Sequence, residues 1–176
     1  MNTTAQQLLP ARSHRWIWLA VLVAVACLLG YGYYLQYVHY LDPCPLCMTQ
    51  RFFYYLLGIA GLIGFFTYRH NVMQRVMGVL AVAAAIGGLV TAGRQVWLQH
   101  LPADQVPECG PGLEFWLENM PFMQTLQLLF KGDGNCAEVH WRFLGLSIAE
   151  WSLAWFILFF IIGCKQLLSR RQVQAH

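Results

Sequence analysis

Charged residues are scarce in this sequence of 176 residues. Asp, Glu, Lys and Arg together make up 11% of it, whereas hydrophobic residues make up 58%. A soluble globular domain carries about 25% charged residues, so this chain cannot cover its surface with charge. The composition therefore argues against an ordinary soluble domain and predicts a membrane protein.

Several motifs are also missing. The sequence has no run of Lys or Arg that would suggest a nucleic-acid surface, and its net charge is only +3. One Cys-x-x-Cys motif is present, but no second such pair and no His-x-x-x-His motif accompanies it. Because a structural zinc site needs four ligands, the sequence disfavours zinc and predicts no metal.

Four long apolar runs predict four membrane-spanning helices, at residues 16–37, 52–68, 76–97 and 146–164. The chain would form one all-α membrane domain, an antiparallel four-helix transmembrane bundle. Its two loops at residues 38–51 and 98–145 would lie on the same side of the membrane. The apolar middle of the second loop is too interrupted to span, and it predicts a short helix lying on the membrane interface.

The first apolar run has a second interpretation as a cleaved signal peptide, because residues 24–27 read Ala-Val-Ala-Cys. The run continues through Leu28 and Leu29 and is longer than a signal-peptide core, which favours a retained span. In the third run, small residues are concentrated between Ala81 and Gly88. They predict a face on which neighbouring helices approach closely.

Basic residues are distributed unevenly between the two sides of the predicted membrane. All 8 acidic residues lie on one side or at its edge. By the positive-inside rule, both termini are predicted to be cytoplasmic and both loops to lie outside. The basic residues on the cytoplasmic side are seven of the 11 Lys and Arg: Arg12, Arg15, Arg69, Arg75, Lys165, Arg170 and Arg171.

The sequence contains six cysteines, which is many for a cytosolic enzyme. An oxidising compartment facing the two outer loops would explain why four of them fall there. Cys27 lies in the middle of the first span and Cys164 at the end of the fourth, so both are predicted to be inert. The four loop cysteines are Cys44, Cys47, Cys109 and Cys136.

The pair Cys44 and Cys47 points to redox chemistry, because a two-residue gap lets the sulfurs form a short, labile disulfide. Pro43 and Pro45 keep the approach extended, so a helix is expected to begin near Cys47. The positive end of that helix would favour a Cys47 thiolate, and so would Arg51 four residues later. A structural disulfide is the alternative interpretation.

His100 closes the third apolar run, on the same side of the membrane as the start of the second. A single histidine at a helix end is typical of the membrane interface. In an antiparallel bundle, however, these two helix ends should be neighbours, which would bring His100 near the cysteine pair. Arg94, near the same end, is predicted to be an interfacial anchor.

These motifs resemble those of the disulfide bond formation protein B (DsbB) family of bacterial inner membranes. The resemblance covers nearly the whole chain. It rests on Pro-Cys-Pro-Leu-Cys followed by Arg51, on Gln95 and His100 at the end of the third span, and on residues 135–138 and 141–146, Asn-Cys-Ala-Glu and Trp-Arg-Phe-Leu-Gly-Leu. Two places depart from the family: the segment around Cys109, and Gln50, where at least some members have an acidic residue.

The resemblance implies a membrane thiol oxidase. Such a protein-disulfide oxidoreductase reoxidises a soluble, periplasmic, thioredoxin-like dithiol oxidase (DsbA-like) and passes the electrons to a membrane quinone, either ubiquinone or menaquinone. By position, Cys44 and Cys47 match the quinone-coupled pair, and Cys109 and Cys136 match the pair that oxidises the soluble partner.

The same resemblance matches Arg51 with an arginine that assists the quinone, and His100 with a histidine beside it. Two other functions are compatible with the motifs. One is a non-catalytic membrane scaffold whose outer loops are stapled by disulfides, and the other is a thiol reductase that sends electrons outward. A Cys-x-x-Cys pair at a helix start with a cation nearby favours catalysis over stapling, and the resemblance favours the oxidase.

Overall fold

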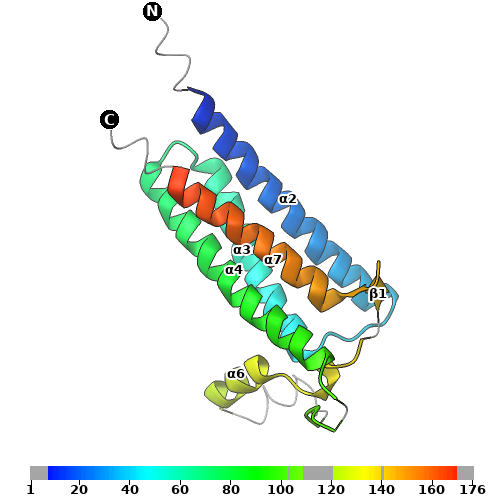
Figure 1. Cartoon of the computed structure of the whole chain (residues 1–176). Coiled ribbons are helices and arrows are strands. Elements are labelled where there is room, and N and C mark those ends of the chain that lie inside the picture. The colour runs from blue at the N-terminus through cyan, green and yellow to red at the C-terminus, as the bar shows by residue number, and fades with distance from the viewer. Residues whose placement is uncertain (1–7, 103, 109–120, 140, 170–176) are drawn as a thin grey trace, which may run out of the picture.

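Four long helices make up most of the protein, whose computed structural model describes residues 8–102, 104–108, 121–139 and 141–169. They run alternately up and down, side by side, as Figure 1 shows. Each is long and apolar enough to cross a membrane, which confirms the predicted all-α four-helix bundle. The helices are α2 (Leu8–Val38), α3 (Pro45–Phe66), α4 (Asn71–Gln99) and α7 (Ile148–Ser169).

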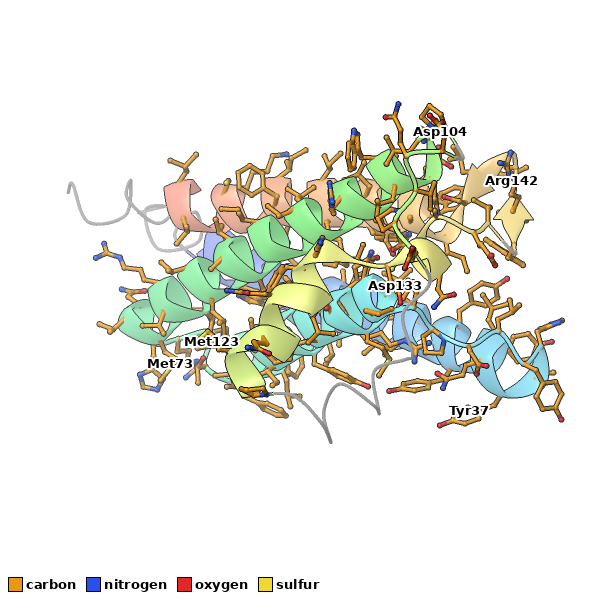
Figure 2. All side chains as sticks on the ribbon, turned by 90° about the horizontal axis from the view of Figure 1, so that it is seen from below. Tyr37, Met73, Asp104, Met123, Asp133 and Arg142 are labelled. Atoms are coloured by element: carbon orange, nitrogen blue, oxygen red, sulfur yellow. The ribbon has the colours of Figure 1, made fainter. Side chains whose placement is uncertain are left out.

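The shorter elements gather at one end of the bundle. The beginning of α2 and the end of α7 both lie at the other end of the bundle (Figure 1). Figure 2 shows the same division, with Met73 at one end and Tyr37, Asp104 and Arg142 at the other. The short elements are α6 (Phe122–Lys131), the 3₁₀ helix η1 (Gly134–Cys136), and the antiparallel strands β1 (Arg142–Phe143) and β2 (Leu146–Ser147).

Helix α6 lies within the stretch for which a short loop helix was predicted. Arg94 of α4 reaches toward it, because its Nε donates to the carbonyl oxygen of Lys131 at 3.3 Å. The guanidinium of Arg94 also stacks 4.3 Å from the ring centroid of Trp97. Residues 113–120 of the predicted stretch lie outside the described residues.

Small residues allow the helices of the bundle to pack closely. Ala81, Ala84 and Ala85 of α4 are buried in the core, as the small-residue run predicted. Gly88 of the same helix faces Phe156 of α7, and a Cβ atom built on Gly88 would lie 2.2 Å from the Phe156 ring. The aromatic ring therefore occupies the space that a side chain at position 88 would need.

The start of α7 is fixed by a reciprocal pair of hydrogen bonds. The backbone N–H of Ser147 donates to Glu150 Oε2 at 2.7 Å, and the backbone N–H of Glu150 donates to Ser147 Oγ at 3.3 Å. This is a capping box, which the sequence pattern Ser-x-x-Glu signals. The fourth helix consequently begins at Ile148, after a short hairpin, rather than at residue 146 where the predicted span began.

The other three helices begin earlier than the predicted spans, and α2 begins at Leu8 rather than at residue 16. Helix α3 begins at Pro45, whereas the predicted span began at residue 52, and α4 begins at Asn71 rather than at residue 76. The predicted loop around Arg75 therefore shortens, because Arg75 lies within α4. Hydropathy locates the apolar part of each span but not the polar turns that extend the helix beyond it.

The tight contact at position 88 predicts a stability effect. Gly88→Ala should destabilise the bundle by about 1–3 kcal/mol, because the added methyl group overlaps a fully buried ring. Gly93→Ala in the same helix is the matched control, since a Cβ atom there meets nothing within 4 Å. Thermal unfolding in detergent should show a lower midpoint for the first variant only. Equal midpoints for both variants would contradict this packing.

Candidate active site

Cys44 and Cys47 lie at the start of α3. Cys44 immediately precedes the helix, with an extended backbone at φ −68° and ψ 163°. Pro45 is the first helical residue, where its missing N–H leaves no hydrogen bond unmade, and this is why the helix begins before Cys47. The two sulfur atoms lie 3.1 Å apart. A small side-chain rotation would bring them to the roughly 2.05 Å of a disulfide bond.

A turn of the second cysteine-bearing loop brings Cys136 to the same place. Its fully buried side chain packs in a small cluster with Cys44, Leu46 and Leu98. Gly132 opens the turn with φ 73°, and a Cβ atom there would lie 2.7 Å from Leu46 and 3.0 Å from Leu98. Glycine accommodates both this backbone conformation and this close approach. Three cysteines from two separate loops therefore meet at one point.

The contact between Cys44 and Cys136 changes the acidity of Cys44. The pKa of the Cys44 thiol is raised, first by its interaction with the Cys136 thiol, then by that with Cys47, and then by burial. The thiolate is the nucleophilic form of cysteine. When reduced, Cys44 is therefore held as a neutral thiol, and within a disulfide it is suited to being attacked.

Asp133 places a carboxylate beside Cys136. The side chain of Asp133 is 4% exposed, and its Oδ1 lies 3.6 Å from Cys136 Sγ. Its second oxygen accepts a hydrogen bond from Asn135 Nδ2 at 3.2 Å. Figure 2 labels Asp133 close to the ends of α3 and α4. The Cys136 thiol can therefore donate a hydrogen bond to this carboxylate.

Two buried glutamines lie near the cysteine pair, Gln50 on α3 and Gln95 on α4. Gln95 Nε2 lies 3.2 Å from Cys47 Sγ and 3.5 Å from Cys44 Sγ. Gln50 Nε2 donates to Gln95 Oε1 at 2.6 Å. Neither glutamine was predicted from the sequence to be a site residue. The available signal was the position of Gln95 inside an apolar span, since buried polar groups in a membrane are costly unless they have a partner.

Arg51 lies one helical turn after Cys47 and is held against α2. Its Nη1 donates to Gln36 Oε1 at 2.5 Å, and its Nη2 donates to the carbonyl oxygen of Gly32 at 3.3 Å. The guanidinium carbon lies 4.8 Å from the ring centroid of Tyr33. These contacts hold the guanidinium against α2, and Arg51 lines the inner cavity together with both cysteines.

Two neighbouring cavities lie at this end of the bundle, and the inner one adjoins the cysteine pair. The inner one, of about 140 Å³, is lined by Cys44, Cys47 and Arg51. The outer one, of about 480 Å³, lies between α2, α7 and the hairpin and is predominantly apolar. Both are lined by Leu28 and Tyr54, among other residues. The outer cavity has aromatic walls formed by Tyr31, Trp141, Phe143, Trp151 and Trp155.

The sequence of the chain matches one family of membrane proteins. The model of the family "Disulfide bond formation protein DsbB" matches residues 14–165. The chain belongs to the DsbB family. It is 46% identical over 156 residues to disulfide bond formation protein B of Marinobacter nauticus, a match that covers 89% of this chain and 93% of that protein.

Other relatives carry similar names. Over 147 residues the chain is 48% identical to disulfide bond formation protein B of Hahella chejuensis, covering 84% of this chain and 89% of that protein. Over 162 residues it is 38% identical to disulfide bond formation protein B 1 of Pseudomonas aeruginosa, covering 92% and 99%. This DsbB-family membership assigns the protein to disulfide bond formation and makes it a disulfide oxidoreductase.

Of the four loop cysteines predicted for this DsbB-family protein, three lie in the described structure. Cys109 lies outside the described residues. Glu108, which precedes it in the sequence, accepts a hydrogen bond at its carbonyl oxygen from the backbone N–H of Gly134 at 3.2 Å. The backbone just before Cys109 is therefore bonded to the turn that carries Cys136.

The remaining predicted residues are distributed as follows. His100 caps the end of α4 with an exposed ring, its Nδ1 lies 2.8 Å from the carbonyl oxygen of Val96, and it lines neither cavity. Cys27 in α2 and Cys164 in α7 lie outside the buried cysteine cluster. Within the described part of the chain, no three His, Cys, Asp or Glu side chains are grouped to bind a metal ion.

The glycine that opens the Cys136 turn yields a prediction about disulfide exchange. Gly132→Ala should slow the formation of a Cys44–Cys136 disulfide, because the methyl group would push the turn away from Leu46. Gly145→Ala is the matched control, since Gly145 also has a positive φ, of 84°, but a Cβ atom there meets nothing within 4 Å. Both variants carry backbone strain of about 1–2 kcal/mol.

The rate is measured by mild oxidation of the fully reduced protein, followed by peptide mapping of the disulfides. We expect a slower rate for the Gly132 variant only. If both variants form the disulfide equally fast, the close approach of the turn does not control the meeting of the two sulfurs.

Proposed function

We propose that the protein is a membrane thiol oxidase. In this proposal it takes electrons from a soluble, thioredoxin-like dithiol protein outside the membrane and passes them to a membrane quinone. The observation that carries the proposal is the position of Cys44, which contacts both Cys47 and Cys136 beside a cavity that shares Leu28 and Tyr54 with a larger, mainly apolar one. A scaffold stapled by disulfides would need neither a third cysteine at this point nor a cavity.

The exchange begins at the Cys109–Cys136 disulfide. A thiolate of the partner attacks Cys109 Sγ, a mixed disulfide forms, and the Cys109–Cys136 bond breaks with its electron pair leaving on Cys136. The second thiol of the partner then attacks the mixed disulfide and releases Cys109 as a thiol. The partner has lost two electrons and two protons. The bond between Gly134 and Glu108 supports this pairing of the loop cysteines.

The second exchange transfers the electrons to the cysteines of α3. The Cys136 thiolate attacks Cys44 Sγ, the Cys44–Cys136 disulfide forms, and the Cys44–Cys47 bond breaks with its electron pair leaving on Cys47. Burial of Cys136 against Cys44 favours attack at Cys44 over attack at Cys47. Cys109 then attacks Cys136, which restores the Cys109–Cys136 disulfide and leaves Cys44 and Cys47 reduced.

The chain offers groups suited to a quinone. The apolar ring and tail of a quinone match the aromatic outer cavity. The carbonyl oxygens of a quinone match the guanidinium of Arg51, which has N–H donors beyond those that bond Gln36 and Gly32. When bound, a quinone supplies an acceptor for the two electrons and two protons released as Cys44 and Cys47 return to the disulfide. His100 lines neither cavity and lies exposed at the end of α4.

The proposal includes a location and an orientation. The basic residues flanking the spans favour cytoplasmic termini and outward-facing cysteine loops. The family resemblance favours the bacterial inner membrane, with a periplasmic DsbA-like protein as the partner. The oxidising periplasm also fits the four cysteines of the outer loops.

A coupled assay tests the function. Purified protein in detergent receives a reduced thioredoxin-like dithiol protein and a water-soluble quinone, and quinone absorbance is followed together with thiol loss. We expect one quinone to be reduced for each partner disulfide formed. Cys136→Ser should abolish the reaction, whereas Cys164→Ala should not change it. A scaffold would give no quinone reduction, and a reductase would instead consume partner disulfides when quinol is added.

Arg51 can be tested in the same assay. Arg51→Ala should raise the KM for quinone and lower turnover by about 10²-fold, as expected for the loss of a charged donor at a reaction centre. Arg51→Lys should restore only part of the activity, because an ammonium lacks the planar fork that bonds Gln36 and Gly32 together.

Exchange between the partner and the Cys109–Cys136 disulfide should remain intact in both variants. Arg94→Ala is the control, because Arg94 contacts α6 and lines neither cavity. Wild-type quinone kinetics in Arg51→Lys would show that Arg51 acts as a simple positive charge or as an anchor.

A further inference from the structure

The buried amides of Gln50 and Gln95 have a defined orientation. Their side chains are 3% and 4% exposed, and they face each other between α3 and α4. A buried amide must find partners for both its donor and its acceptor end, since an unmade hydrogen bond in an apolar region is costly. For Gln95 those partners are the Gln50 side chain and the sulfur atoms of the cysteine pair.

The direction of the amide of Gln95 follows from its two neighbours. Gln50 Nε2 donates to Gln95 Oε1 at 2.6 Å, so the oxygen of the Gln95 amide is directed toward Gln50. The NH₂ group of Gln95 then faces the sulfurs, with Nε2 3.2 Å from Cys47 Sγ and Oε1 farther away at 3.6 Å. A thiolate accepts hydrogen bonds, so this orientation favours a negative charge on Cys47.

We propose that Gln95 is a catalytic residue that donates an N–H hydrogen bond to Cys47 as this sulfur leaves, and that Gln50 is the positioning residue that holds the amide in this direction. The proposal rests on the exchange proposed above. As Cys136 attacks Cys44, the bond between Cys44 and Cys47 breaks and its electron pair passes to Cys47 Sγ. Gln95 stabilises that charge without transferring a proton.

Charged and titratable groups around Cys47 come from several elements. Arg51 lies on α3, Asp42 and Glu138 come from the two loops, and all three line the inner cavity. Cys136 packs beside Cys44 from η1. The described residues of α2, α4 and α7 that line this cavity carry no charge. Substitution of Gln95 by an apolar residue therefore removes a neutral donor and leaves every charge near Cys47 unchanged.

The donor can be tested on the reduced, full-length protein without quinone or partner. Cys47 is alkylated with iodoacetamide over a range of pH, and its modification rate is read from the Cys47 peptide by mass spectrometry. Gln95→Met keeps a similar side-chain volume but has no N–H donor. In Gln95→Met we expect the pH midpoint of Cys47 alkylation to rise by about one unit, which corresponds to about a tenfold loss of Cys47 thiolate at a given pH below the midpoint.

Two further variants complete the design. Gln50→Met leaves Gln95 in place but frees the Gln95 amide to turn. The pH midpoint of Cys47 alkylation should therefore rise by less in Gln50→Met than in Gln95→Met. Gln99→Met is the matched control. Gln99 is one turn farther along α4 and lines the same cavity, but its Oε1 accepts a hydrogen bond from Ser147 Oγ at 2.8 Å. Its midpoint should equal that of the wild type.

Each result bears on the proposal. A wild-type midpoint in Gln95→Met, or an equal rise in Gln99→Met, would overturn the role of Gln95. A rise in Gln95→Met with none in Gln50→Met would retain the donor and overturn the positioning role of Gln50. If Gln95→Met fails to fold, a wild-type midpoint in Gln50→Met overturns the proposed pair. Because alkylation needs neither quinone nor partner, these outcomes are independent of the quinone-reduction assay.

Discussion

The packing of the Cys136 turn onto the start of α3 is the contact on which the site depends. It buries Cys136 against Cys44, Leu46 and Leu98, and it brings together cysteines that are about ninety residues apart in the sequence. The contact is possible because Gly132 adopts a positive φ with no side chain in the way. Disulfide exchange requires sulfurs in contact, so this small apolar cluster makes an exchange path between the two loops geometrically possible.

The bundle beneath the site is held by close packing and by a few buried polar contacts. At its other end, Trp18 Nε1 donates to Gln74 Oε1 at 2.7 Å, and Gln74 Nε2 donates to the carbonyl oxygen of Gly64 at 2.6 Å. These bonds connect α2, α3 and α4 in the same way that Gln50 and Gln95 connect α3 and α4 near the cysteines. Where water is absent, such amides satisfy each other and fix the relative position of the helices.

Charge and polarity around the cysteines are divided between different neighbours. Arg51 supplies a positive charge that is fixed by Gln36 and Gly32 on α2, whereas Gln95 supplies a neutral donor directly to the sulfurs. Asp133 lies on the other side, beside Cys136. The inner cavity is lined by Cys47 but not by Asp133.

Much of this protein could be predicted from local properties of the sequence. Apolar run length and low charge predicted the four-helix bundle, because a membrane-spanning helix satisfies its backbone hydrogen bonds within itself. The Cys-x-x-Cys spacing also placed Cys44 and Cys47 together, because only two residues separate them in the sequence. The capping box at Ser147 and Glu150 was also readable, although the predicted span overlooked it.

The tertiary structure decided which distant residues meet. His100 and Gln95 are both polar residues near the end of α4, but helix rotation directs Gln95 to the sulfurs and leaves His100 exposed at the cap. Composition and spacing do not define that rotation, because it depends on how the small-residue faces of α3, α4 and α7 pack against one another. The placement of Cys136 against Cys44, and the cavity beside them, likewise arise only when the loop closes onto the bundle.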